Sequence, residues 1–122
     1  MSGQHNRLLG QWGESLAARY LIDRGYRILD ANWRCRFSEI DLIAKEKGYL
    51  CFVEVKLRKN DRMAAAKEFV DFRKQKKLHT AAQLYLSIHP TKEQPRFDVI
   101  EIYAPDGLQT VRPEIHHITN AF

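Results

Sequence analysis

Apolar and polar positions follow two different rhythms along this chain of 122 residues. Near the N-terminus the apolar residues recur every three to four positions, which predicts an amphipathic helix that Asn6 caps and Gly25 ends. Its buried face is expected to comprise Leu9, Gly13, Leu16, Ala17, Tyr20 and Leu21. A glycine on that face would let the helix approach a neighbouring sheet closely.

From residue 26 onward the rhythm changes to the alternation that is typical of strands. Short strands are predicted around residues 26–29 and 33–37, and two longer ones over 40–44 and 50–55. A second helix is predicted from residue 72 to about 88, with Asp71 as its N-cap and Pro90 beyond its end. Further strands over 96–102 and 114–118 complete an α/β order of helix, three strands, helix and strand with one added strand, in which the two short segments count together as the first strand. A chain of this length fits a single domain over residues 1–122.

The two longer strands flank a turn at residues 46–49, where Gly48 can supply the positive φ of a tight hairpin. If Lys47 and Gly48 are the central pair, Asp41 faces Glu54 and Glu39 faces Lys56. Period-2 alternation then puts these four side chains on one face of the sheet. The opposite face would carry Ile40, Leu42, Val53 and Val55. The alignment holds only for an even-length loop, because a one-residue slip reverses every side chain.

Charged residues in such apolar strands need an explanation. Directly opposed like charges are destabilising, and a divalent cation between Asp41 and Glu54 would remove the conflict. Lys56, one alternation beyond Glu54, could then orient the attacking water or stabilise charge on a phosphate, as in metal-assisted phosphodiester hydrolysis. The alternative is an ordinary ladder of cross-strand ion pairs near the rim of a sheet. Glu14, considered alone, fits an exposed acid near the start of a helix, where the helix dipole favours it.

The charge balance favours a polyanionic partner. The chain carries 20 basic and 15 acidic residues, a formal charge of +5 and a sequence pI near 9.4. Basic residues flank the hairpin at Arg34, Arg36 and Arg58 and recur at Lys74 in the first turn of the second helix. Each could be a solvated surface charge, but beside a carboxylate pair they suggest contacts to nucleic-acid phosphates.

Two further expectations concern the setting of the protein. The sequence has no run of about 18 apolar residues and no apolar signal segment within residues 1–10, which predicts a cytoplasmic protein that does not enter membranes. Cys35 and Cys51 are not spaced as a metal knuckle or redox pair, so they are expected to be reduced structural thiols. The polar, alanine-rich residues 59–67 are expected to form a mobile connection that could help to enclose substrate.

Several of these segments together resemble one family nearly from end to end. The segments are Gly13-Glu14 with Ala17, residues 32–35 (NWRC), 39–43 (EIDLI), 52–56 (FVEVK) with Arg58, Lys74-Gln75, 96–99 (RFDV) and 120–122 (NAF). In combination they resemble the YraN family of small bacterial endonuclease-like proteins. That family is similar to the archaeal Holliday-junction resolvases of the restriction-endonuclease-like PD-(D/E)xK superfamily. Two departures concern loop geometry: Ser38 replaces the usual glycine, and residues 63–66 lack the usual phenylalanine-glycine pair.

The resemblance implies an αβββαβ core with a mixed central sheet flanked by helices, DNA as substrate, and Mg²⁺ or Mn²⁺ as cofactor. It implies that Asp41 and Glu54 bind the metal, that Lys56 is the catalytic lysine, and that Glu14 completes the site from the first helix. It also implies a homodimer, because a branched junction presents paired scissile strands. The competing hypothesis is a nucleic-acid-binding or protein-docking module on a nuclease fold that does not cut. The residues do not distinguish DNA from RNA.

Overall fold

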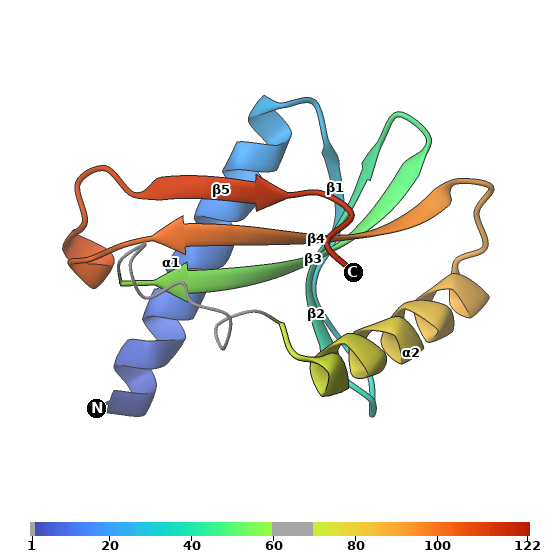
Figure 1. The fold of residues 1–122 in the computed structure, drawn as a ribbon, viewed down its shortest axis with the longest axis horizontal. Coiled ribbons are helices and arrows are strands. Elements are labelled where there is room, and N and C mark those ends of the chain that lie inside the picture. Colours follow the sequence, from blue (N-terminus) through green and yellow to red (C-terminus); the bar gives the residue numbers. More distant parts are fainter. Residues whose placement is uncertain (1, 60–69) are drawn as a thin grey trace.

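The computed structural model describes residues 2–59 and 70–122, which form two long helices and five strands (Figure 1). In chain order the elements are α1 (Ser2–Asp23), β1 (Arg27–Arg34), β2 (Glu39–Glu46), β3 (Tyr49–Arg58), α2 (Phe72–Ile88), β4 (Gln94–Tyr103), the 3-10 turn η3 (Gly107–Gln109) and β5 (Glu114–Ile118). Neither long helix in these ranges has a window apolar enough to cross a membrane. The connection predicted over residues 59–67 lies, apart from Lys59, outside the described residues.

The strands form one sheet in the order β1-β2-β3-β4-β5. All neighbours are antiparallel except β3 and β4, which pair in parallel from Tyr49 with Gln94 to Arg58 with Tyr103. Parallel neighbours require a crossover connection, and α2 lies in it. The predicted α/β class and αβββαβ order are therefore confirmed, and β5 extends the sheet beyond β4.

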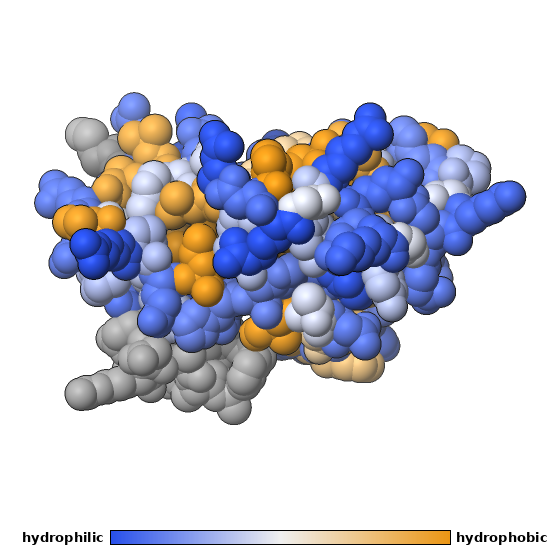
Figure 2. All heavy atoms as spheres, turned by 90° about the horizontal axis from the view of Figure 1, so that it is seen from above, coloured by the Kyte–Doolittle hydropathy of each residue, from blue (hydrophilic) through white to orange (hydrophobic). Residues whose placement is uncertain are grey.

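The two helices cover opposite faces of the sheet. On one face α2 buries Leu78, Ala81, Ala82 and Tyr85 against apolar residues of the sheet such as Phe52. On the other face α1 buries Ala17 and Leu21, and it crosses behind the strands in Figure 1. Gly13 permits this contact, because a Cβ atom at that position would lie 3.1 Å from Cδ2 of Leu57. The surface seen in Figure 2 is mainly hydrophilic, with separate apolar patches rather than one continuous apolar face.

The turn between β2 and β3 has the predicted register. Lys47 and Gly48 both have positive φ, 40° and 88°, as a two-residue type I′ turn requires. The ladder runs from Glu46 paired with Tyr49 to Leu42 paired with Val53. The predicted alignment of the hairpin is therefore confirmed over its paired length, which stops one residue short of Asp41 and Glu54.

The strict alternation predicted for β2 is wrong at Asp41. Ile40 packs in the cluster under α2, whereas Leu42 packs in the cluster under α1, so these two residues face opposite sides. On the neighbouring strand Asn32 has a left-handed backbone with φ of 53°. Asparagine tolerates that conformation better than most residues, and one such residue interrupts the side-to-side alternation of a strand. The alternation of side chains is thus interrupted at Asn32 in β1 and at Asp41 in β2, which lie beside each other.

Two predicted element boundaries are also wrong. The separate strands expected around residues 26–29 and 33–37 are one strand, β1, with a register shift between Ile28 and Asp30. Asn6 does not cap α1 but lies inside it, because the helix already begins at Ser2. The second helix matches its prediction, since Asp71 caps it by accepting a hydrogen bond of 2.9 Å from the Lys74 N–H.

Candidate active site

Asp41 and Glu54 lie where β2 and β3 separate. The backbone pairing between these strands ends at Leu42 and Val53. Beyond it, Oδ2 of Asp41 accepts a hydrogen bond of 2.8 Å from the Val55 N–H. A side chain of β2 thus satisfies a backbone donor of β3. Glu54 lies next to that donor and is only 6% exposed, and Asp41 is partly buried.

The two carboxyl groups interact electrostatically. Burial, and next the negative charge of Glu54, raise the pKa of Asp41 to about 7, against the lowering effect of the Val55 N–H. A carboxylate surrounded by balancing donors would shift in the other direction. The charged form of Asp41 is therefore disfavoured in the folded protein.

Glu14 approaches the same place from α1. Burial raises the pKa of Glu14, and the nearby charge of Asp41 raises it further, while a hydrogen bond from the Asn32 side chain lowers it. Glu14 is therefore not the freely exposed acid that its sequence position alone suggests. The structure brings it to Asp41, so α1, β2 and β3 each contribute one carboxyl group.

Two lysines approach Glu54 from the other side. Nζ of Lys56 lies 3.7 Å from Oε2 of Glu54, and Nζ of Lys74 lies 3.8 Å from the same oxygen. Both side chains keep about a third of their surface exposed, 33% and 37%, whereas Glu54 keeps 7%. The two ammonium groups can therefore reach a molecule bound at the surface while touching a buried carboxylate.

The donor set suits a hard divalent cation. Carboxylate oxygens are ligands that Mg²⁺ prefers, and a cation between Asp41 and Glu54 would balance the charge that raises the pKa of Asp41. Within residues 2–59 and 70–122, no three His, Cys, Asp or Glu side chains are close enough to hold a metal ion by themselves. Two carboxylates would therefore hold such an ion, and water or substrate oxygens would complete its shell.

Glu39 does not have the partner that the hairpin alignment suggests. The sequence places it opposite Lys56, but it is paired with Arg34 across β1 and β2, where its Oε1 lies 3.6 Å from the Arg34 Nε. The reason is the separation of β2 from β3, which starts beyond Leu42 and removes Glu39 from the β3 ladder. Glu39 thus belongs to the β1 side of the site.

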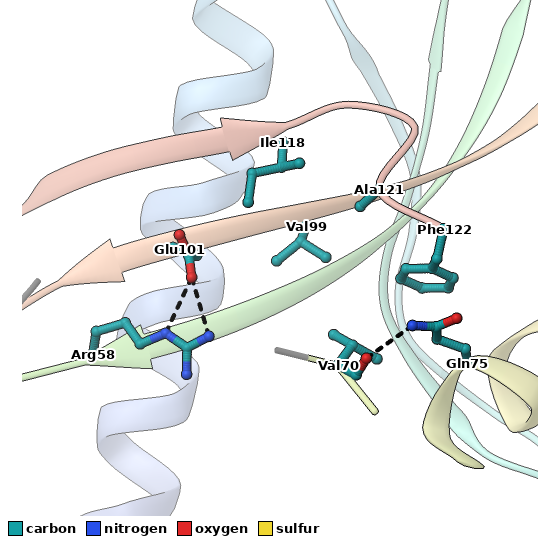
Figure 3. A pocket seen from close by; sticks show the side chains of 8 residues that line it. All are labelled: Arg58, Val70, Gln75, Val99, Glu101, Ile118, Ala121 and Phe122. Atoms are coloured by element: carbon teal, nitrogen blue, oxygen red, sulfur yellow. Dashed lines mark hydrogen bonds and ion pairs between the residues drawn. The ribbon is translucent and has the colours of Figure 1, made fainter. Parts of the chain in front are cut away.

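Arg58 is buried, whereas the sequence suggests an exposed residue that contacts phosphates. It is 8% exposed, and its Nε and Nη2 atoms donate hydrogen bonds of 3.2 Å and 3.0 Å to Oε2 of Glu101 on β4 (Figure 3). Both residues line a cavity of about 230 Å³ that also borders Val70 and Phe122. This geometry assigns Arg58 to the packing of β3 against β4.

The other three basic residues are accessible. Arg34 keeps 77% of its side chain exposed despite its pairing with Glu39. Arg36 is exposed, and its guanidinium lies 4.9 Å from the centre of the Phe37 ring. Together with Lys74 they leave positive charge available at the β1–β2 side and at the start of α2.

Sequence reasoning missed the part that Asn32 plays. Its left-handed backbone and its hydrogen bond to Glu14 both belong to the site. An asparagine inside a strand pattern is the signal that could have revealed it, because Asn is depleted in strands and tolerated at positive φ.

The chain was also compared with known proteins. A family model described as "Uncharacterised protein family UPF0102" matches residues 13–102. This range includes the predicted site residues Glu14, Asp41, Glu54 and Lys56, and also Lys74. A UPF0102 protein of Caldanaerobacter subterraneus subsp. tengcongensis is 42% identical over 123 residues and is covered completely, as is this chain. Relatives from Syntrophomonas wolfei and Chlorobium phaeobacteroides are 43% and 46% identical, with 96% and 93% of this chain and 99% and 93% of theirs covered. The resemblance to the YraN family is thereby confirmed, and the chain belongs to the uncharacterised protein family UPF0102.

Proposed function

We propose that this protein is a metal-dependent endonuclease that acts in the cytoplasm and hydrolyses phosphodiester bonds of DNA, with a preference for branched structures. The observation that carries the proposal is the close pair of carboxyl groups of the buried Glu54 and the partly buried Asp41, in which burial and then the charge of Glu54 raise the pKa of Asp41 to about 7. A buried pair of like charges is costly, and such sites are more often functional than structural. Lys56, next to the pair, supplies the cation that phosphoryl chemistry needs beside a metal.

Each residue then has a definite task. Asp41 and Glu54 would hold Mg²⁺ or Mn²⁺, which supplies a Lewis acid for the phosphate and lowers the pKa of a bound water. Lys56 orients the attacking water and stabilises the negative charge that develops on the phosphate oxygens. Glu14 approaches Asp41 from α1, so it can accept a hydrogen bond from a water at the edge of the site. The Asn32 side chain lies close enough to Glu14 to lower its pKa.

The DNA backbone would be held by Arg34, Arg36 and Lys74, which are accessible around the site. Such contacts give position and salt-dependent affinity but no choice of sequence. Arg58 is not included, because its guanidinium is buried against Glu101. A homodimer would place two such sites on the paired strands of a junction, and light scattering of the protein with and without junction DNA measures it.

A cleavage assay tests the proposal. The purified protein is incubated with end-labelled four-way, flapped and linear DNA in Mg²⁺ and in Mn²⁺. We expect cleavage of the branched substrates in both metals, none in EDTA, and at least about a 100-fold loss in Glu54→Ala and Lys56→Ala, since both residues act at the reacting phosphate. A labelled RNA of the same structure shows whether the sugar matters.

The matched control is Glu93→Gln, which removes a carboxylate that pairs with Lys45 away from the proposed site. Its activity should equal that of the unchanged protein. Cleavage that persists in Glu54→Ala would refute the assignment of the site. Salt-sensitive DNA binding without cleavage in any metal would favour the competing function, a nucleic-acid-binding module on a nuclease fold.

A further inference from the structure

Lys74 occupies a fixed position at the start of α2. Its N–H donates a hydrogen bond of 2.9 Å to the Asp71 carboxylate, and the next residue, Gln75, bonds through its N–H to the Asp71 carbonyl at 2.9 Å. The Gln75 side chain also donates a hydrogen bond of 2.9 Å to the Val70 carbonyl (Figure 3). These three bonds hold the first turn of the helix, so the backbone at Lys74 is well placed to direct its side chain at Glu54.

Lys74 and Lys56 share a single oxygen of Glu54. The two Nζ atoms lie 3.8 Å and 3.7 Å from Oε2, although they come from different elements, α2 and β3. Oε2 of Glu54 thus has two ammonium partners at once. An additional cation at Glu54 must therefore compete with both lysines.

The ammonium groups of Lys56 and Lys74 also suit a phosphate. A phosphodiester that enters the site brings one negative charge close to both ammonium groups, and Lys74 has 37% of its side chain exposed with which to meet it. The N-terminus of α2 adds its positive dipole on the same side. A lysine that only contacted the DNA backbone would not need to touch a buried carboxylate.

We propose that Lys74 is a second lysine of the reacting site, which occupies Glu54 while no cation is bound and moves to the scissile phosphate when a divalent cation takes its place. This inference rests on the proposed function and assigns Lys74 a task beyond general backbone contact. Lys74 therefore opposes cation binding in the absence of DNA and supports it once a phosphate is present. No covalent step is involved, since the exchange only redistributes ion pairs.

The test measures cation affinity separately from cleavage. Mn²⁺ is titrated calorimetrically into the full-length protein and into Lys74→Gln without DNA. The variant should bind Mn²⁺ about three- to tenfold more tightly, as expected for the loss of one partly screened unit charge near the site. Lys77→Gln, an exposed lysine three residues further along the same helix, is the matched control and should leave the affinity unchanged.

Lys74→Gln should at the same time cleave branched DNA about tenfold more slowly at saturating metal, because the phosphate loses one charged contact. An unchanged or weaker Mn²⁺ affinity of this variant would overturn the inference and leave the proposed function standing. Tighter Mn²⁺ binding with cleavage at the original rate would also overturn it, since Lys74 would then do nothing for the phosphate. If the unchanged protein binds no Mn²⁺ at all, the proposed function fails and the inference fails with it.

Discussion

Two aspartates on neighbouring parts of the same sheet show opposite electrostatics. Asp98 on β4 is fully buried and accepts hydrogen bonds of 2.9 Å from Nε and Nη2 of Arg96 and of 3.0 Å from the Asn120 N–H, while Nε2 of His117 lies 2.8 Å away. Burial alone would raise the pKa of Asp98, but these partners together lower it. Asp41, which is less buried, faces Glu54 and Glu14, and its pKa is raised.

The difference separates an acid that is satisfied within the fold from one that is a candidate for function. The partners of Asp98 come from β4, β5 and the C-terminal residues, and they stabilise its negative charge within the protein. Asp41 accepts a hydrogen bond from the Val55 N–H but lies beside two further carboxyl groups, which help to raise its pKa. Burial alone therefore does not distinguish a candidate site, whereas a raised pKa with a specific like-charged neighbour does.

The largest expected effect is on stability, at Asp98. Asp98→Asn should lower the free energy of unfolding by about 2–4 kcal/mol, because Arg96 loses its ion pair with this fully buried carboxylate and keeps Glu46, at 3.4 Å, as a carboxylate partner. Urea denaturation in EDTA measures this loss. The control Glu93→Gln breaks a more exposed pair and should cost less than about 1 kcal/mol. Equal losses in both variants would contradict the structural role of Asp98.

The next effect compares two basic residues of β3. Lys56→Ala should reduce DNA cleavage about 100-fold and leave the free energy of unfolding within about 1 kcal/mol, because the lysine is partly exposed and acts on the phosphate. Arg58→Ala should instead lower stability, since Glu101 would stay buried without its ion-pair partner and with only the hydroxyl of Tyr103 as a described side-chain donor. Its rate per folded molecule should be unchanged. The comparison breaks down if Arg58→Ala slows cleavage in fully folded protein.

A smaller effect should follow from the metal. Mg²⁺ at about ten times its dissociation constant should stabilise the protein by about 1.4 kcal/mol, since it binds the folded state alone. Thermal unfolding with and without Mg²⁺ measures the shift. Glu54→Gln should abolish it, whereas Asp98→Asn should keep it at a lower melting temperature. A shift that survives in Glu54→Gln would mean that the ion binds elsewhere.

The smallest effect concerns pH in metal-free protein. The pKa of Asp41 is about 7 in the folded state and near 3.8 when unfolded, so the folded state binds the proton more tightly. Between these values the free energy of unfolding therefore falls as pH rises, and the loss is complete above about pH 7. Asp41→Asn should remove this fall and be more stable than the unchanged protein at about pH 8 by on the order of 1 kcal/mol. A difference that does not depend on pH would show that Asp41 is not protonated on folding.

Local signals in the sequence were sufficient for the hairpin. A glycine at position 48 and the apolar runs on either side of it determine the turn, and the turn determines the register that brings position 41 toward position 54. The second helix was equally readable, because an N-cap, an apolar stripe and a proline lie within one short segment. Glu14 needed the family resemblance, since nothing local connects a helix residue to a strand 27 positions away.

The failures arise where distant residues decide. Arg58 looks exposed in the sequence because its partner, Glu101, is 43 residues further along the chain. The break in alternation at Asp41 depends on the backbone of Asn32 in the neighbouring strand, which a period-2 pattern cannot represent. Glu39 was misplaced for the same reason, as the separation of β2 from β3 cannot be read from either strand alone.

The parallel pairing of β3 with β4 has a consequence for the order in which the candidate site is assembled. The hairpin of β2 and β3 joins neighbouring residues and should form early, within microseconds, whereas β4 can join β3 only after the chain has crossed over through α2. Asp41 and Glu54 thus meet early, but Lys74 reaches Glu54 only when α2 docks. We expect a growing or partly folded chain to hold its acidic pair without its full complement of lysines, so that the complete set of charged side chains on which the proposed function depends is assembled last in folding.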